Sequence, residues 1–128
     1  MTLNHVLIVD DDEAIRELLQ LYFQDAWPAC RTVTACNGLE ALVELQQQVF
    51  DLAVLDYQMP GMNGLELAQS ARQLMPNLRM MLISGSRPQT ISQAIKQGIF
   101  DDYLDKPFTL DEFLAKVDQI EHRREPLL

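Results

Sequence analysis

Five polar side chains stand at the points where short apolar runs of the sequence end, and their types could bind a metal ion and react. They are Asp10, Asp11, Asp56, Ser84 and Lys106. Carboxylates gathered in one crevice repel each other unless a cation lies among them, and Mg²⁺ prefers oxygen ligands of this kind. With Mg²⁺ and the Lys106 ammonium supplying positive charge, the crevice can accept a phosphoryl group, for which an ionised Asp56 is a candidate nucleophile. These residues predict a magnesium site in which Asp56 becomes an aspartyl phosphate.

The apolar runs are typical of strands in a parallel sheet. His5–Val9 is almost continuously apolar, as expected for a strand that is covered on both faces. β-branched residues support a second strand over Arg31–Ala35, which has the character of an edge strand. The remaining expected strands are Leu52–Leu55, Met80–Ile83 and a short piece around Tyr103-Leu104.

Helical patterns separate these strands. An apolar stripe with helical spacing runs from Ile15 to Tyr22 and is closed off by Pro28. A further helix is expected over Ile91–Gln97, ended by Gly98. The other three are expected to start at capping boxes, in which an Asn or Thr cap precedes a Glu by three residues. These boxes are Asn37–Glu40, Asn63–Glu66 and Thr109–Glu112, and the first two share the tetrapeptide Asn-Gly-Leu-Glu.

The alternation of five strands with five helices predicts an α/β fold with a doubly wound, flavodoxin-like parallel sheet. Crossovers between parallel strands are right-handed, so helices cover both faces of such a sheet. Functional groups then gather outside the carboxyl ends of the strands, where the five polar residues would meet. The alternation does not determine the strand order; we choose 2-1-3-4-5 because the second strand suits an edge.

Length, charge and cysteine content narrow the class of protein. A chain of 128 residues suits one domain. Its formal net charge of -9 argues against direct binding to nucleic acid phosphates or anionic membranes. Cys30 and Cys36 match no metal-ligand spacing or disulfide framework, so we expect free thiols. No signal peptide or membrane-spanning run is evident, and we expect a cytoplasmic protein.

Four motifs in order resemble the receiver domain of two-component response regulators. They are Asp10-Asp11 after the run VLIV, the block DYQMPGMNG from Asp56 to Gly64, Ser84 after MLI, and Lys106-Pro107-Phe108. Each motif is weak alone, but together at strand ends they are specific. The resemblance extends from Leu3 to about His122. It implies a receiver domain over residues 1–122 and a short C-terminal tail over residues 123–128.

The resemblance implies a role for each matching residue. Asp56 is the expected phosphoacceptor, and Mg²⁺ is expected to bind Asp56, Asp11 directly, Asp10 mostly through water, and the backbone carbonyl of Gln58. Ser84 and Lys106 are expected to bind phosphoryl oxygens, and Tyr103 matches the aromatic switch. The Lys106-Pro107 peptide bond is expected to be cis.

A few positions near the predicted site depart from the family pattern or have a simple structural interpretation. Ser84 replaces the more usual Thr, which keeps the hydroxyl. The segment Gly98–Asp102 is one residue longer than is usual, so the preceding helix is expected to end early. We interpret the Asp101-Asp102 pair as a solvated loop, and expect Met59 and Met62 to be partly exposed beside the site.

The receiver interpretation implies particular partners. A sensor histidine kinase or a histidine phosphotransfer protein would supply the phosphoryl group, and an output domain or effector protein would respond to a changed surface formed by the fourth helix, fifth strand and fifth helix. The chain is expected to assist only its own phosphorylation and dephosphorylation, to be no enzyme otherwise, and to be a monomer or weak homodimer. A phosphorelay intermediate and a non-phosphorylated interaction module are the alternatives.

Two other classes fit less well. A phosphohydrolase of the haloacid dehalogenase type needs a second Asp two residues after the nucleophile, where this chain has Gln58. A flavodoxin-like cofactor binder needs a phosphate-cradling loop after the first strand, where Asp10, Asp11 and Asp12 would repel a phosphate.

Overall fold

The computed structural model of the protein describes residues 3–86 and 88–123, and the described chain alternates strands with helices. The strands are β1 (His5–Val9), β2 (Arg31–Ala35), β3 (Leu52–Asp56), β4 (Arg79–Ser84) and β5 (Asp102–Asp105). The helices are α1 (Glu13–Ala26), α2 (Gly38–Gln47), α3 (Gly64–Leu74), α4 (Gln89–Lys96) and α5 (Leu110–His122). All strand pairs are parallel, in the order β2-β1-β3-β4-β5. The predicted fold class and strand order are confirmed.

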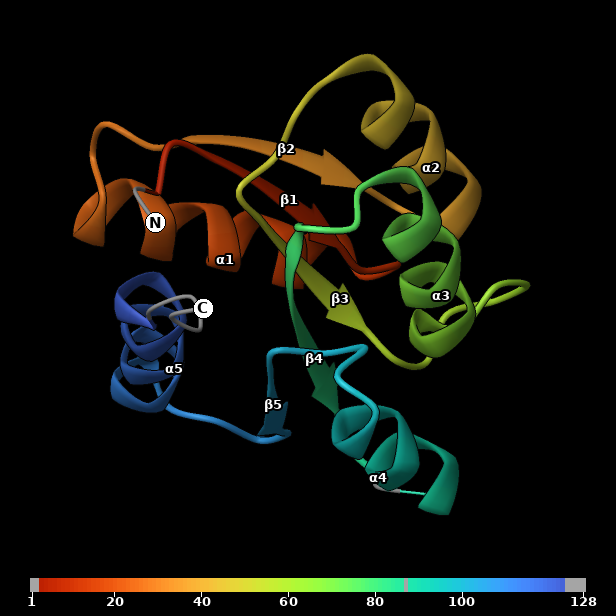
Figure 1. The fold of residues 1–128 in the computed structure, drawn as a ribbon. Helices are drawn as coiled ribbons and strands as arrows, with labels where there is room; N and C mark the ends of the chain where they lie inside the picture. The colour runs from red at the N-terminus through yellow and green to blue at the C-terminus, as the bar shows by residue number, and fades with distance from the viewer. Residues whose placement is uncertain (1–2, 87, 124–128) are drawn as a thin grey trace.

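Helices cover both faces of this sheet. Figure 1 shows α1 and α5 on one side and α2, α3 and α4 on the other. Because successive side chains of a strand point to opposite faces, Val6 and Ile8 pack in the α1–α5 layer while Leu7 and Val9 pack in the other layer. Every residue of β1 and β3 is buried, which explains their continuously apolar sequences. No helix within the two described ranges is both long and apolar enough to cross a membrane.

Element ends differ slightly from those expected. β3 includes Asp56 and β4 includes Ser84, so both polar residues are the last residues of their strands. α4 ends at Lys96, just before the expected end, and Gly98 follows with a φ of 80° in the left-handed region that favours glycine. Arg123 follows α5, whereas residues 124–128 of the expected tail lie outside the described residues.

Two of the three predicted capping boxes are complete, those that begin at Asn63 and Thr109. The prediction at Asn37 is half wrong. Its side chain accepts a hydrogen bond from the Glu40 amide at 2.8 Å, as expected. However, the Glu40 carboxylate reaches past Asn37 and accepts from the Cys36 amide at 3.2 Å. Cys36 and the buried Cys30 are free thiols, as predicted.

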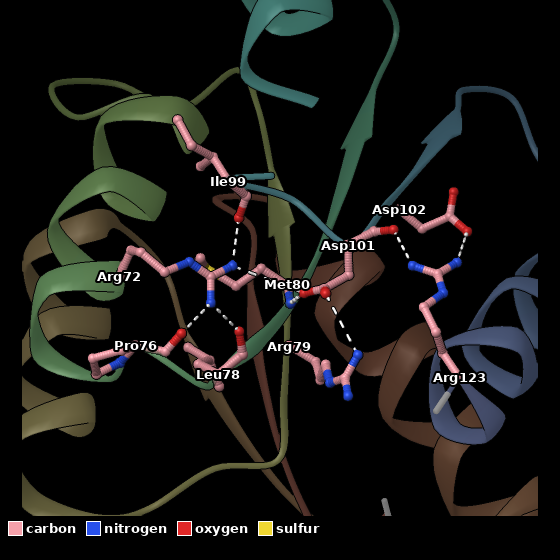
Figure 2. Close-up of polar contacts among 9 residues, drawn as sticks. All are labelled: Arg72, Pro76, Leu78, Arg79, Met80, Ile99, Asp101, Asp102 and Arg123. Atoms are coloured by element: carbon pink, nitrogen blue, oxygen red, sulfur yellow. Dashed lines mark hydrogen bonds and ion pairs between the residues drawn. The ribbon is translucent and has the colours of Figure 1, made fainter. Parts of the chain in front are cut away.

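The Asp101-Asp102 pair is a structural anchor, and its interpretation as a solvated loop was wrong. Asp101 accepts a hydrogen bond from the Met80 amide at 2.8 Å, and its carboxylate lies 3.8 Å from Arg72 and 3.7 Å from Arg79 (Figure 2). Asp102 begins β5, and its carboxylate pairs with Lys116 at 3.0 Å and with Arg123 at 3.2 Å. The basic partners come from distant positions, so the local acidic sequence did not reveal them.

Arg72, near the end of α3, joins this helix to the segment before β4 and to the segment between α4 and β5. Its guanidinium donates to the carbonyls of Pro76 at 2.9 Å, Leu78 at 2.5 Å and Ile99 at 2.5 Å (Figure 2). The Ile99 contact holds the segment between α4 and β5 against the start of β4. The longer Gly98–Asp102 segment is therefore fixed at its middle by Arg72 and at its end by Asp101.

Replacing Arg72 with Met should lower the free energy of unfolding by about 2–4 kcal/mol, because three carbonyls lose a charged donor and Asp101 loses one of its cationic neighbours. Urea denaturation measures this loss. The matched control is Arg31→Met, at an exposed arginine, which should change the free energy by less than about 0.5 kcal/mol. Equal effects of the two substitutions would contradict the anchoring role.

Candidate functional site

The carboxyl edge of the sheet brings the predicted site residues together. Asp10 directly follows β1, Asp56 ends β3, Ser84 ends β4 and Lys106 directly follows β5. β1, β3, β4 and β5 are neighbours in the sheet, in that order. Residues that are far apart in the sequence therefore meet at one edge because parallel strands all end there.

Three carboxylates form a compact cluster at this edge. Asp10, Asp11 and Asp56 each offer an oxygen, and these oxygens lie within 4.8 Å of one another. Asp10 is 2% exposed and Asp56 is 5% exposed, whereas Asp11 faces solvent. The cluster is therefore shielded from solvent at Asp10 and Asp56 and accessible to solvent at Asp11. An all-oxygen donor set of this kind fits Mg²⁺.

Burial disfavours the charged forms of these carboxylates. It raises the pKa of Asp10 to about 6, and the negative charges of Asp56 and Asp11 add to the effect, against a hydrogen bond from the Asp12 amide and the charge of Lys106. Burial also raises the pKa of Asp56, while Lys106 opposes that shift. The protein's own groups therefore leave the cluster short of positive charge, which a bound cation would supply.

Lys106 gives the cluster its direct cationic partner. Its Nζ donates a hydrogen bond to Oδ1 of Asp56 at 2.8 Å. Burial lowers the pKa of the Lys106 amine, but this hydrogen bond and the neighbouring carboxylates raise it overall, so the ammonium stays charged. The Lys106-Pro107 peptide bond is cis, as expected.

Ser84 is the last residue of β4, Tyr103 lies two residues before the end of β5, and the hydroxyls of both have other partners. The buried Ser84 hydroxyl donates to the Ser86 carbonyl and accepts from the Ser86 amide at 3.1 Å. Tyr103 is also buried, and its hydroxyl donates to the Asp105 carboxylate. The predicted roles of both residues in phosphoryl binding and switching stay predictions.

The loop between Asp56 and α3 shows one error of the sequence interpretation. Gln58 is exposed, and its carbonyl as a metal ligand stays a prediction. Gly61 has a φ of 81°, which its turn requires. Met59, expected to be partly exposed, is buried in the same core cluster as residues of α2 and α3. Met62 is half-buried, as expected.

Gly64 was expected, like Gly61, to permit backbone angles that other residues resist, but its φ is not positive and it contributes to the site by a close approach instead. A Cβ atom at Gly64 would lie 2.5 Å from the carbonyl oxygen of Asp56 and 2.9 Å from Cα of Tyr57. The Gly64 amide donates to the Tyr57 carbonyl at 2.8 Å. The first turn of α3 thus rests directly on the backbone of Asp56. The sequence did contain a signal for this contact, because a glycine directly follows the Asn cap at a position that many other residues can occupy.

The fold and this edge cluster define a receiver-type signalling domain. Residues 6–118 match the profile of the response regulator receiver domain family, and the chain belongs to that family. It is therefore a receiver domain of two-component signal transduction, as predicted. The chain spans about a quarter to a half of the curated relatives described next.

Relatives and solved structures agree with this assignment. The DNA-binding transcriptional regulator NtrC of Escherichia coli K12 is 38% identical over 122 residues, which are 94% of this chain and 25% of NtrC. Response regulator MprA of Mycobacterium avium is 32% identical over 121 residues, which are 94% of this chain and 52% of MprA. Response regulator TrrA of Thermotoga maritima, solved in complex with Mg²⁺-BeF, is 32% identical with a TM-score of 0.79, covering 92% of this chain and 99% of TrrA. A CheY-like receiver domain protein of Methanospirillum hungatei is 27% identical with a TM-score of 0.83, covering 92% and 93%.

Asp10→Asn should stabilise the metal-free protein, because the buried carboxylate is charged above its pKa. The folded-state pKa of about 6 exceeds the ordinary 3.8, so stability falls as the pH rises between these values and the cost is complete near pH 7.5. Removing that charge should raise the free energy of unfolding by up to roughly 3 kcal/mol. Urea denaturation with a chelator present measures it.

With Mg²⁺ added, the parent should become more stable than Asp10→Asn, since a ligand that binds only the folded state stabilises that state. The parent should gain stability and Asp10→Asn should gain much less. The exposed Asp25→Asn serves as a control and should follow the parent in both conditions. A metal-free Asp10→Asn that is less stable than the parent would contradict the account of the cluster.

Proposed function

We propose that Asp56 accepts a phosphoryl group from a histidine kinase or a histidine phosphotransfer protein in a Mg²⁺-dependent reaction. The observation that carries this proposal is the position of the Asp56 carboxylate, which is buried among Asp10 and Asp11 and hydrogen-bonded to Lys106 at 2.8 Å. Asp56 ends a central strand whose backbone is held by β1, β4 and Gly64. A nucleophile held in this way loses little conformational freedom on reacting.

The transfer forms one bond and breaks another. A carboxylate oxygen of Asp56 attacks the phosphorus of the donor's phosphohistidine, the P–N bond breaks, and its electron pair stays on the imidazole nitrogen. Asp10, Asp11, Asp56 and the Gln58 carbonyl would hold Mg²⁺, which neutralises charge on the phosphoryl oxygens when bound. Lys106 moves its hydrogen bond from the carboxylate to a phosphoryl oxygen. The chain ends the reaction modified, so it acts as a phosphoacceptor and assists only its own phosphorylation and dephosphorylation.

The phosphoryl group should also change a surface. It adds about -1.5 to -2 charge and three acceptor oxygens, which attract the Ser84 hydroxyl. The Ser84 hydroxyl would then break its hydrogen bonds with Ser86, which lies in the segment that leads into α4. Tyr103 is already buried, so its part in the change is a rearrangement at Asp105 that follows the movement of Ser84. The surface formed by α4, β5 and α5 would thereby carry the signal to an output domain or effector protein.

We further propose a cytoplasmic receiver, over residues 1–122 with a tail from residue 123, that is a monomer or weak homodimer. NtrC is a DNA-binding regulator, but this chain matches a quarter of its length and carries a net charge of -9. Any DNA contact is therefore assigned to a separate output domain, and not to these residues. A non-phosphorylated interaction module would have no need for three clustered carboxylates beside a lysine.

Intact mass spectrometry should show one added phosphoryl group after incubation with acetyl phosphate and Mg²⁺. Asp56→Asn should lose the addition, because an amide is not a nucleophile of this kind, and a chelator should suppress it in the parent. Asp25→Asn, which removes an exposed carboxylate from α1, should react as the parent does. Equal rates for Asp56→Asn and the parent would show that the acceptor is a different residue.

Ser84→Ala should still accept the phosphoryl group, about threefold to tenfold more slowly because one hydrogen bond is lost, but should not transmit the change. Amide NMR spectra with and without Mg²⁺ and beryllofluoride, a mimic of the phosphoryl group, measure the transmission. The parent should show shifts at Ser86, in α4 and around Tyr103, and the Ser70→Ala control should match it. If Ser84→Ala gave the same shifts, the signal would not pass through this hydroxyl.

A further inference from the structure

We propose that Gly38, the first residue of α2, is a positioning residue for the loop of residues 57–63, and thereby for Mg²⁺ binding at the cluster. The inference rests on the proposed function, because it assigns this loop, through the Gln58 carbonyl, to the metal site. Gly38 lies in α2, outside this loop, and precedes Asp56 by 18 residues in the sequence. Its effect on the site must therefore pass through a contact.

That contact is with Met62. A Cβ atom at Gly38 would lie 2.6 Å from Sδ of Met62 and 2.9 Å from its Cβ and Cγ. Cβ atoms do not approach other heavy atoms this closely, so a side chain at Gly38 must displace Met62. Displacing only the end of the side chain is insufficient, because Met62 Cβ is attached to the loop backbone. The absence of a side chain at Gly38 is therefore what lets the loop lie against α2.

Both ends of the loop meet a glycine of this kind. Met62, near its end, lies on Gly38 of α2, and the loop's start follows Asp56, whose carbonyl oxygen lies on Gly64 of α3. α2 and α3 are side by side on the same face of the sheet (Figure 1). Gln58 lies between these two supported points. A shift of the loop at Met62 would therefore change the position of the Gln58 carbonyl relative to Asp56.

The repeated tetrapeptide Asn-Gly-Leu-Glu acquires a second role from these contacts. In both copies Asn caps the helix, which explains the Asn and not the glycine that follows it. Alanine restricts the unfolded chain more than glycine does, so it would be the more stabilising residue where the fold accommodates it without strain. Gly64 instead stands where two backbones approach closely, and Gly38 stands where the Met62 side chain lies against α2. The glycines thus serve the loop rather than the helices that they begin.

Isothermal titration of the full chain with Mg²⁺ tests this inference, with thermal unfolding measured in parallel. Gly38→Ala should raise the Kd for Mg²⁺ roughly tenfold, the lower end of what is lost when groups that orient metal ligands are changed. Leu39→Ala is the matched control, because Leu39 is the next residue in the same helical turn and is 70% exposed. It should leave the Kd unchanged.

Met62→Gly provides the second arm, because it removes all three of the atoms that a Cβ at Gly38 would meet. In the Met62→Gly background, Gly38→Ala should raise the Kd by less than about twofold, since neighbouring residues that interact give non-additive effects. If Gly38→Ala alone fails to fold, the double variant still tests the inference, because it should fold and bind Mg²⁺ within about twofold of Met62→Gly. Equal fold-changes in the two backgrounds would overturn the inference, as would a Gly38→Ala protein that binds Mg²⁺ as the parent does while losing thermal stability. Absence of Mg²⁺ binding by the parent would overturn the proposed function along with it.

Discussion

The closeness of like charges is the constraint on which the rest of the site depends. Asp10 and Asp56 are buried, and together with Asp11 they place three carboxylate oxygens within 4.8 Å. Lys106 compensates for one negative charge through its hydrogen bond to Asp56. Burial, with the remaining negative charge adding to it, raises the pKa of Asp10 to about 6. A bound cation would offset the cost of this cluster, and the proposed phosphorylation of Asp56 would depend on that cation.

The backbone around the cluster is built for rigidity. Parallel pairing with β1 and β4 holds the strand that ends at Asp56, and the first turn of α3 rests on its carbonyl through Gly64. At the opposite end of β4, Asp101 and Arg72 join three segments through hydrogen bonds (Figure 2). By contrast, the Ser84 hydroxyl is hydrogen-bonded to Ser86, two residues further along the chain. The structure therefore combines an Asp56 whose backbone is held on several sides with a Ser84 hydroxyl that has local contacts, as the proposed acceptor and switch roles require.

The sequence was sufficient for the architecture because buried parallel strands leave continuous apolar runs, and such strands align their carboxyl ends. Asp10, Asp56, Ser84 and Lys106 could be placed together on that basis alone. The errors concern contacts between distant positions. Asp101 looked solvated because its arginine partners lie 22 and 29 residues earlier in the sequence. Likewise, neither the burial of Met59 nor the approach of Met62 to Gly38 leaves a local pattern.

The most direct test of the central claim is a crystal structure of this chain grown with Mg²⁺ and beryllofluoride. The account predicts a metal ion bound by Asp11 and Asp56, with the Gln58 carbonyl among its ligands, and a beryllofluoride group on an Asp56 oxygen. Lys106 Nζ should have moved from the Asp56 carboxylate to a fluorine atom of that group. Density for beryllofluoride elsewhere, or a Lys106–Asp56 hydrogen bond unchanged beside an empty carboxylate cluster, would contradict it.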